Sequence, residues 1–437
     1  LANAGFPVSS VDPRDIQLFG REQEVPLYVQ GEGDGVFNTG DFIEFYAQKN
    51  DAWKDLALWD DPAHINNPYF SQINDTIRYY LTWDATPQKK RIAVYNNTNY
   101  SGYAGRLWYM TEAIGSLAGG YQKGKRTSFE ATNSLMVEAE GWFNAFVVQA
   151  TSGTVSQTQY LGTTLPFLGS SAPDARVTIV QAGVNNASLG SQDDHHMKLY
   201  NFISGNPNLM IDTTFSGYQL NKFQFNISGY WVDGAGTGFR MDVVHDLLGP
   251  PTDYPDRQTF SYLKIHYART TGNMNYEESG HWWFPDDPGD PPVRHDFASF
   301  IGDPLVYVFA GDSVRRTEPN AGGPGWQVLV PADPMNDTTH AYIYDQDNIQ
   351  LITAIELVTP SGQFTDFAVV EEDSALLIVT DEKLMNGALA YAFYRETNDH
   401  NRYNTVVADV DELYDQYGGG FKRHPLAIRG YAAHVYD

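Results

Sequence analysis

Four adjacent residues, Asp193, Asp194, His195 and His196, form the most metal-like group of side chains in the sequence. Carboxylate oxygens and imidazole nitrogens both bind zinc. Two neighbouring histidines on a regular strand point to opposite faces, however, and cannot bind the same ion. Nothing else nearby completes a set of ligands. We therefore expect a polar loop at these positions, with a metal site as the alternative.

A short acidic segment near the start of the chain carries oxygen ligands of the kind that calcium prefers, on Glu32, Asp34, Asn38 and Asp41. Their spacing is not that of an EF-hand loop. The glycines between them are also typical of ordinary turns. We interpret the segment as a turn, with calcium binding as the alternative. Calcium is the one cofactor that the sequence suggests.

The segment 234–238, Gly-Ala-Gly-Thr-Gly, has the composition of a phosphate-binding loop. Such a loop follows a strand and opens a helix, whose first N–H groups bind the phosphate. Here the sequence is typical of β structure on both sides. We therefore expect a hairpin turn.

Two pairs of carboxylates, Glu138 with Glu140 and Glu371 with Glu372, have the residue types of a glycosidase acid and base. We expect the first pair on one face of a strand and the second pair in a loop. A chain with 54 acidic residues contains such pairs by chance, so we interpret both as solvated charges. A G-x-S-x-G serine hydrolase motif is also absent. The sequence therefore assigns no catalytic, cofactor-binding or metal-binding residue.

Aromatic residues are frequent, and two groups have the character of a sugar-binding platform: residues 281–284, His-Trp-Trp-Phe, and the pair Tyr230 and Trp231. An exposed ring stacks on the apolar face of a sugar. Large rings are costly to leave in water, however, and most tryptophans of a β-sandwich pack in its core. We expect these residues to be core or loop anchors, with a ligand platform as the alternative.

Charge and composition exclude several classes of function. The chain has 28 basic and 54 acidic side chains, which gives a formal charge of −26. This charge disfavours nucleic acid or an anionic membrane surface as the main partner. The chain has no cysteine, which excludes disulfides, Cys-ligated zinc and a thiol nucleophile within these residues. No run of about 18 apolar residues occurs, so no transmembrane helix is expected.

The spacing of apolar residues predicts a mainly β protein up to about residue 372. Alternating and β-branched runs predict strands at 15–20, 41–47, 77–83, 176–184, 223–227, 262–267, 305–309 and 350–355. Polar turns separate these runs, which is typical of antiparallel β-sandwich or jelly-roll domains. We divide the chain into a β domain, a sandwich domain, a further β domain or extension, and an α/β segment, at 1–115, 116–270, 271–372 and 373–437.

The pattern changes near residue 374. Residues 375–380 and 405–410 are apolar runs of the kind that forms strands buried on both faces. Helical stretches are expected at 382–395, 411–417 and 425–436. Alternating strands and helices predict a parallel α/β unit. About 65 residues are too few for a whole domain of this type, so we expect only its beginning here.

These last residues resemble a known family. Residues 375–380, 404–417 and 427–431 are similar to the opening of the peptidase domain in the gingipain-type cysteine peptidases, where a second strand precedes a helix with an Ala-Ile-Arg motif, here Ala427, Ile428 and Arg429. Upstream segments resemble the β domains of PorU-like type IX secretion sortases, namely residues 35–46, 67–81 and 359–366. The resemblance implies a caspase-like α/β domain after the β domains.

The same resemblance implies a function for the whole protein. In this family the catalytic His and Cys lie downstream of the Ala-Ile-Arg helix, so the present chain is expected to be non-catalytic. A thiolate activated by His would form an acyl-enzyme with a peptide carbonyl. Water then gives proteolysis, and an amine on anionic lipopolysaccharide gives the sortase product.

The implied partners are secreted cargo proteins with a C-terminal signal and a PorV-like β-barrel shuttle protein of the outer membrane. The implied location is the cell surface of a member of the Bacteroidota, in association with the outer membrane. Three triplets resemble the O-glycosylation signal of that phylum, at 75–77, 312–314 and 373–375. Their acceptors would be Thr76, Ser313 and Ser374.

Two other functions stay open from the residues alone. The first is a non-catalytic surface β-sandwich module that binds carbohydrate or protein, which the aromatic content and low charge density favour. The second is a glycoside hydrolase. The chain begins at Leu1 and stops after a helix-like segment, and we expect both ends to be cut from a longer polypeptide.

Overall fold

The structure of the chain is a computed structural model. It describes residues 1–86, 88–125, 134–149, 153–187, 192–247, 255–271, 279–297, 300, 302–322, 325–369, 375–398 and 402–436. The carboxylate pair Glu371 and Glu372 lies outside the described residues, and so do Asp373 and Ser374 of the third glycosylation triplet.

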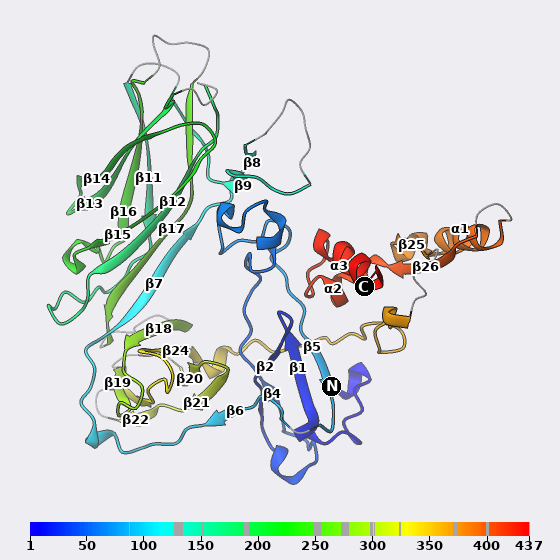
Figure 1. Cartoon of the computed structure of the whole chain (residues 1–437). Helices are drawn as coiled ribbons and strands as arrows, with labels where there is room; N and C mark the ends of the chain where they lie inside the picture. Colours follow the sequence, from blue (N-terminus) through cyan, green and yellow to red (C-terminus); the bar gives the residue numbers. More distant parts are fainter. Residues whose placement is uncertain are drawn as a thin grey trace. The chain divides into compact units, whose positions relative to one another are not determined.

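The chain forms two compact units (Figure 1). The first unit comprises Leu1–Ala57, Ser71–Ile92 and Leu351–Asp437, and the second comprises Leu58–Phe70 and Ala93–Gln350. The first unit therefore brings together the two ends of the sequence. The four predicted domain ranges stay a prediction.

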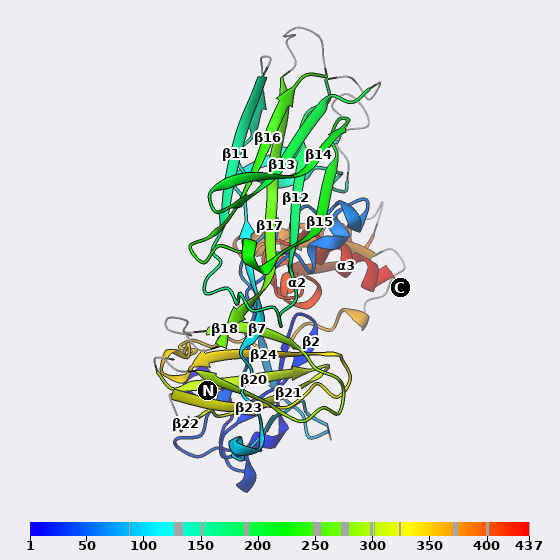
Figure 2. The same ribbon diagram turned by 90° about the vertical axis from the view of Figure 1, so that its left-hand side faces the viewer.

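The second unit contains an antiparallel β-sandwich (Figure 2). Its smaller sheet has the strand order β11-β16-β13-β14, with bounds Gly153–Leu161, Thr237–His245, His195–Ile203 and Asn206–Phe215. The larger sheet begins with the order β15-β12-β17-β7, with bounds Leu220–Ile227, Ala175–Gly183, Asp256–Thr270 and Trp108–Ser116. The predicted β-sandwich is confirmed.

Alternation of side chains builds the sandwich core. Successive residues of a strand face opposite sides, so every second residue of each sheet points at the other sheet. The buried apolar residues that pack together here include Val177, Ile179, Met197, Leu199, Phe239, Met241, Val243, Leu263 and Ile265. The side chains of β13 on the outer face of its sheet are polar or aromatic, namely His196, Lys198, Tyr200 and Phe202.

The larger sheet continues beyond the sandwich. After β7 it runs through β18, β24, β20, β21 and β6, with bounds Ser279–Pro285, Thr338–Asp345, Pro304–Ala310, Ser313–Thr317 and Ile92–Val94. A second sheet has the order β19-β23-β22, with bounds Val293–Phe297, Gly325–Val330 and Asn320–Gly322. Side chains of both sheets, among them Trp282, Phe284, Phe297 and Val328, form a second core. Shorter strands complete the unit at β8 (Gly120–Lys123), β9 (Glu140–Phe143) and β10 (Val147–Gln149).

The N-terminal part of the first unit is a small β module. Its strands are β1 (Ile16–Gly20), β2 (Gln23–Val25), β3 (Tyr28–Val29), β4 (Ile43–Glu44) and β5 (Tyr80–Trp83). The β1–β2 turn consists of Arg21 and Glu22, whose φ angles of 52° and 61° are those of a type I′ hairpin. Buried side chains of β1 and its neighbours form a core of their own.

The C-terminal part of the first unit is the predicted α/β segment. Strands β25 (Ala375–Thr380) and β26 (Asn404–Asp409) pair in parallel. The helices are α1 (Met385–Thr397), α2 (Val410–Tyr417) and α3 (Pro425–Tyr436). The side chain of Asp409 caps α2 by accepting the N–H of Asp411. None of the helices in the described part of the chain is long and apolar enough to cross a membrane.

Two expectations about single elements are wrong. Residues 350–355 form no strand, and Leu351 is 79% exposed. A β-prone run forms a strand only when it pairs with another strand, and this run has no strand partner among the described residues. Strands β25 and β26 are half-buried rather than buried on both faces. A parallel strand is buried on both faces where other elements cover both faces of its sheet, and the described part of this segment does not supply that cover.

Candidate functional site

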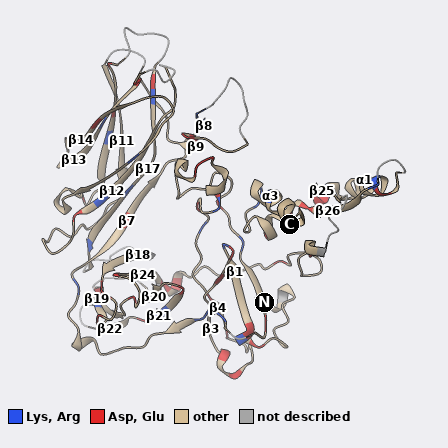
Figure 3. Ribbon diagram, viewed as in Figure 1, with Lys and Arg blue, Asp and Glu red and all other residues tan. Residues whose placement is uncertain are grey.

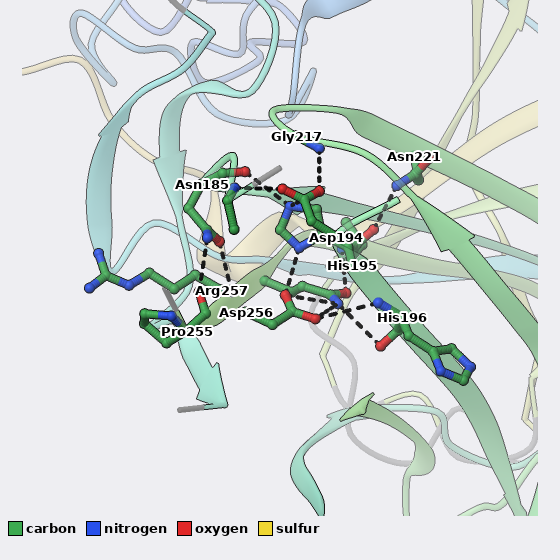
Figure 4. A network of polar contacts seen from close by, with 12 residues as sticks. Asn185, Asp194, His195, His196, Gly217, Asn221, Pro255, Asp256 and Arg257 are labelled. Atoms are coloured by element: carbon green, nitrogen blue, oxygen red, sulfur yellow. Dashed lines mark hydrogen bonds and ion pairs between the residues drawn. The ribbon is translucent and has the colours of Figure 1, made fainter. Parts of the chain in front are cut away.

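His195 and His196 lie at the start of β13, and not in the polar loop that the sequence suggested (Figure 4). The two side chains point to opposite faces of the strand, as expected. The His195 side chain is fully buried, whereas that of His196 is 11% exposed.

His195 is held between acceptors at both of its ring nitrogens. Its Nδ1 donates to Asp256 Oδ1 at 2.6 Å, and its Nε2 donates to the carbonyl oxygen of Asn185 at 3.0 Å. Asp194 Oδ1 lies 3.6 Å from the same Nε2. A ring that donates at both nitrogens carries two protons and a positive charge.

Electrostatics agree with a charged His195. Burial lowers its pKa, but the hydrogen bond to Asp256 and the charges of Asp256 and Asp194 outweigh burial. The resulting pKa is raised above the ordinary value of 6.5. His195 is therefore an imidazolium between two carboxylates.

The two carboxylates are also bonded to the backbone. Asp194 accepts the N–H groups of Ala187 at 2.6 Å and Gly217 at 2.7 Å. Asp256 accepts the side-chain N–H of Gln258 at 3.1 Å. Further amide hydrogen bonds extend the network from Gln258 through Gln181 to Asn221. The network connects β13 to β12, to β17 and to the turn before β15. We interpret its role as structural.

His196 pairs with two carboxylates on the outer face of the same sheet. Its Nε2 lies 2.7 Å from Asp212 Oδ1, and its Nδ1 lies 2.8 Å from Asp246 Oδ1. Burial lowers the pKa of His196, but the hydrogen bonds and charges of both carboxylates raise it more. Because both nitrogens already bind carboxylates, neither offers a lone pair to a metal. Among the described residues, no group of three or more His, Asp or Glu is arranged to hold a metal ion.

The acidic segment after β3 forms a turn, which is drawn partly in red in Figure 3. Asp34 accepts the N–H of Val36 at 3.0 Å, and Asp41 accepts the N–H of Asn38 at 2.6 Å. Glu32 pairs with Arg91, whose Nε lies 2.9 Å from Glu32 Oε2. These oxygens therefore bind donors of the chain itself.

The glycine-rich segment and the first carboxylate pair form no functional site in the described residues. Residues 234–236 lie in a turn of the connection between β15 and β16, and Thr237 and Gly238 begin β16. Because β15 and β16 belong to different sheets, the expected hairpin is wrong. Of the first carboxylate pair only Glu140 lies in β9. Glu138 accepts the N–H of Leu220, and Glu140 accepts that of Val137. Each carboxylate thus has its own partners, and the two do not face a shared site.

The aromatic motifs divide between core and surface. Trp282 is completely buried in the second core. Trp283 lies on the opposite face of β18, where its ring stacks on His340 with centroids 4.8 Å apart. Tyr230 is 68% exposed, whereas its neighbour Trp231 packs against the sandwich core. The expectation of core residues therefore holds for Trp282 and Trp231 but not for Tyr230.

Of the proposed glycosylation acceptors, Thr76 and Ser313 are exposed. The Oγ of Ser313 donates to the carbonyl oxygen of Ala310 at 2.8 Å. Their modification stays a prediction.

Sequence reasoning missed a buried cluster in the first unit. Asp55 Oδ1 lies 3.2 Å from His424 Nε2 and accepts the Ser71 hydroxyl at 3.2 Å. The N–H of Gln72 donates to Asp55 Oδ2 at 2.6 Å. A carboxylate stands between Ser71 and His424, so the histidine cannot take the serine proton and the cluster is not a catalytic triad.

A second contact joins the same parts of the first unit. Arg78 Nη1 donates to both oxygens of Asp415, at 2.8 and 2.6 Å, and the Tyr80 hydroxyl donates to Asp415 at 2.9 Å. The contacts of Asp55 with His424 and of Asp415 with Arg78 and Tyr80 join residues that are 335 to 369 positions apart. No local pattern could have indicated them. They connect the N-terminal β module to the α/β segment within one unit.

Sequence comparisons find no relative. No protein-family model and no curated protein matches this chain.

Comparison with solved structures does find a similar fold. The dimeric latent form of PorU from Porphyromonas gingivalis matches 100% of this chain with a TM-score of 0.54 and 12% sequence identity. The match spans 38% of that PorU chain. Two further structures match with lower scores. The glycoside hydrolase domain of Endo-D from Streptococcus pneumoniae R6 has a TM-score of 0.18 at 10% identity, over 56% of this chain and 33% of its own. Infectious bursal disease virus, Gx strain, has a TM-score of 0.17 at 10% identity, over 52% and 49%.

Of these three structures, PorU has a TM-score above 0.5, which indicates a shared fold. An identity of 12% supports a statement about fold and about nothing further. The structural resemblance that the sequence predicted is thereby confirmed: this chain has a PorU-like fold.

Proposed function

We propose that this chain is the β-domain portion, with the first part of an α/β domain, of a cell-surface cysteine peptidase or sortase similar to PorU. The observation that carries the proposal is the match of the whole chain to part of PorU. The order of elements supports it as well, because a parallel strand–helix–strand unit follows the antiparallel domains. The chain itself would be non-catalytic.

The nucleophile would be a cysteine thiolate activated by a histidine. This chain has no cysteine, so under the proposal the nucleophile belongs to a part of the polypeptide outside these 437 residues. The family resemblance implies that the histidine lies there as well. The substrates would be the C-terminal signals of secreted cargo proteins. Water as acceptor gives cleavage, and an amine of anionic lipopolysaccharide gives attachment. The partner would be a PorV-like β-barrel protein of the outer membrane.

The described residues would serve this function by holding the α/β segment in place. The buried hydrogen bond between Asp55 and His424 and the ion pair between Arg78 and Asp415 connect it to the N-terminal β module. Their role under this proposal is to fix the geometry of the segment. Exposed apolar side chains on α1, namely Leu389, Phe393 and Tyr394, are typical of a helix that further elements of a domain would cover.

The test uses the natural polypeptide purified from its own cells. It is incubated with a cargo protein that carries its C-terminal signal. In a parallel sample the tested protein is first alkylated with iodoacetamide. The masses of the products are measured by mass spectrometry. We expect removal of the signal by the untreated protein and none after alkylation. Cleavage that survives alkylation, or no cleavage at all, would contradict the proposal.

A further inference from the structure

The outer face of the smaller sandwich sheet carries two neighbouring aromatic rings. Tyr160 projects from β11 and Phe202 from β13, on either side of β16. Their ring centroids are 6.3 Å apart and their planes differ by 15°. Tyr160 lies near the end of the edge strand β11, and its ring is 68% exposed. So large an exposed aromatic surface is costly to leave in water.

A glycine makes room for this arrangement. Gly238 pairs with Tyr160 across β11 and β16. A Cβ atom at position 238 would lie 2.7 Å from the Tyr160 ring and 2.9 Å from the Phe202 ring. Both rings therefore occupy the space that any other residue at 238 would need. We call Tyr160, Phe202 and Gly238 the aromatic platform.

A fixed polar group borders the aromatic platform on β16. The guanidinium carbon of Arg240 lies 4.4 Å from the centre of the Tyr200 ring and 6.0 Å from that of Phe202. Asp242 holds the guanidinium from its other side, with Nε 2.8 Å from Oδ1 and Nη2 3.1 Å from Oδ2. A guanidinium has five N–H groups, so a pair of this kind keeps donors for a ligand.

Each of the three cationic side chains on this face is paired with a carboxylate. Lys198 lies 3.3 Å from Asp212, Arg240 pairs with Asp242, and His196 lies 2.8 Å from Asp246. A fourth carboxylate, Asp193, accepts the Thr214 hydroxyl, in a chain whose formal charge is −26. A face whose cations are already paired does not attract an anionic polymer, so it suits an uncharged ligand.

We propose that this face binds an uncharged pyranose oligosaccharide. A pyranose ring has an apolar C–H face, which stacks on an aromatic ring, and a rim of hydroxyl groups, which bond to guanidinium and carboxylate groups. The aromatic platform would take the C–H face, while Arg240, whose side chain is 26% exposed, would donate to hydroxyl groups. Asp242 is buried and would hold Arg240 in place. This binding is independent of the proposed peptidase function and goes beyond it.

The test compares two tyrosines of equal exposure. Tyr160 and Tyr230 are both 68% exposed in the same unit, but only Tyr160 belongs to the aromatic platform. The whole chain is titrated by calorimetry with cellohexaose, maltohexaose and chitohexaose, and with heparin as an anionic control. We expect at least one of the neutral hexaoses to bind. Tyr160→Ala should weaken that binding at least about tenfold, Tyr160→Phe should keep most of it, and Tyr230→Ala should leave it unchanged.

Several results would overturn the proposal. They are the absence of binding by all three neutral hexaoses, a preference for heparin, and an equal loss for Tyr160→Ala and Tyr230→Ala. Hydrogen exchange of β11, β13 and β16 peptides shows whether each variant keeps the sheet. A Tyr160→Ala protein that keeps its exchange protection and binds as well as the parent also refutes the proposal.

Discussion

His195 with Asp256 in the second unit can be compared with His424 with Asp55 in the first. Both histidines are completely buried, and each lies close to an aspartate from a distant part of the sequence. The separation is 61 residues in the sandwich and 369 residues in the first unit. Each pair therefore joins two segments that are distant in the sequence.

The two histidines differ in protonation because their second ring nitrogens have different partners. Nε2 of His195 faces a carbonyl oxygen, so this nitrogen must carry a proton. Nδ1 of His424 instead accepts the N–H of Leu426 at 3.3 Å, so it carries none. His195 is therefore a cation, while His424 is a neutral ring that donates from Nε2 to Asp55. The charge of a buried histidine therefore depends on the partners of both ring nitrogens, and not on the His–Asp pair alone.

The largest expected effect is that of His195→Gln. This substitution leaves Asp194 and Asp256 buried without their cation, which typically costs about 3–5 kcal/mol. We expect the free energy of unfolding of the sandwich to fall by that amount. Urea unfolding followed by hydrogen exchange of β13 peptides measures it. A loss below about 1 kcal/mol would mean that His195 is not the cation described here.

A pH titration of the sandwich should show the charge of His195 next. The pKa of His195 is raised above 6.5, so the folded chain binds this proton more tightly than the unfolded chain does. The stabilisation is therefore complete below about pH 6.5 and is lost as the pH rises through the raised pKa. The His196 pKa is also raised and acts in the same direction.

The measurement is the urea midpoint of β13 exchange at about pH 6 and about pH 9. We expect a lower midpoint at the higher pH for the parent chain and a smaller change for His195→Gln. Equal changes in the two proteins would contradict the assignment.

The same substitution should cost less in the first unit. His424→Gln keeps a neutral N–H donor for Asp55, so only the geometry of one hydrogen bond changes, at a cost of about 1–2 kcal/mol. Hydrogen exchange of α3 peptides in urea reports this loss. If His424→Gln costs as much as His195→Gln, the difference in protonation is refuted.

The smallest expected effect has the opposite sign. His295 is completely buried in the second core, and neither of its ring nitrogens has a hydrogen-bond partner among the described residues. Burial lowers its pKa to about 3. Replacing an unpaired buried polar ring with an apolar side chain should stabilise this core, so we expect His295→Leu to raise the unfolding free energy by about 1 kcal/mol. Exchange of β19 peptides is the measurement, and a destabilisation above about 1 kcal/mol would show that His295 has a role that its contacts do not indicate.

The sequence predicts the α/β segment better than it predicts the sandwich sites. Residues 375–380 are a continuous apolar run, and strand β25 occupies the predicted positions. Local patterns suffice there because apolar periodicity and the cap at Asp409 both lie within the segment. The run at 350–355 has similar β propensity but forms no strand, because strand formation depends on a partner that the local sequence does not contain.

The candidate sites depend on distant partners. The local sequence from Asp193 to His196 is typical of a polar loop. The carboxylates that pair with His196 and His195, namely Asp246 and Asp256, come 50 and 61 residues later. The aromatic platform was missed for a similar reason. Tyr160, Phe202 and Gly238 meet only through the register of three strands, although a tyrosine among the Ser and Thr residues of an exposed strand was a visible signal.

The most direct test of the central claim is thiol labelling of the natural polypeptide. The protein is isolated from its cells, labelled with an iodoacetamide probe, digested and mapped by mass spectrometry. We expect one polypeptide to yield both the peptides of this chain and a labelled cysteine peptide, with an intact mass well above that of these 437 residues. An intact mass equal to that of these residues, with no labelled peptide, would contradict a cysteine peptidase.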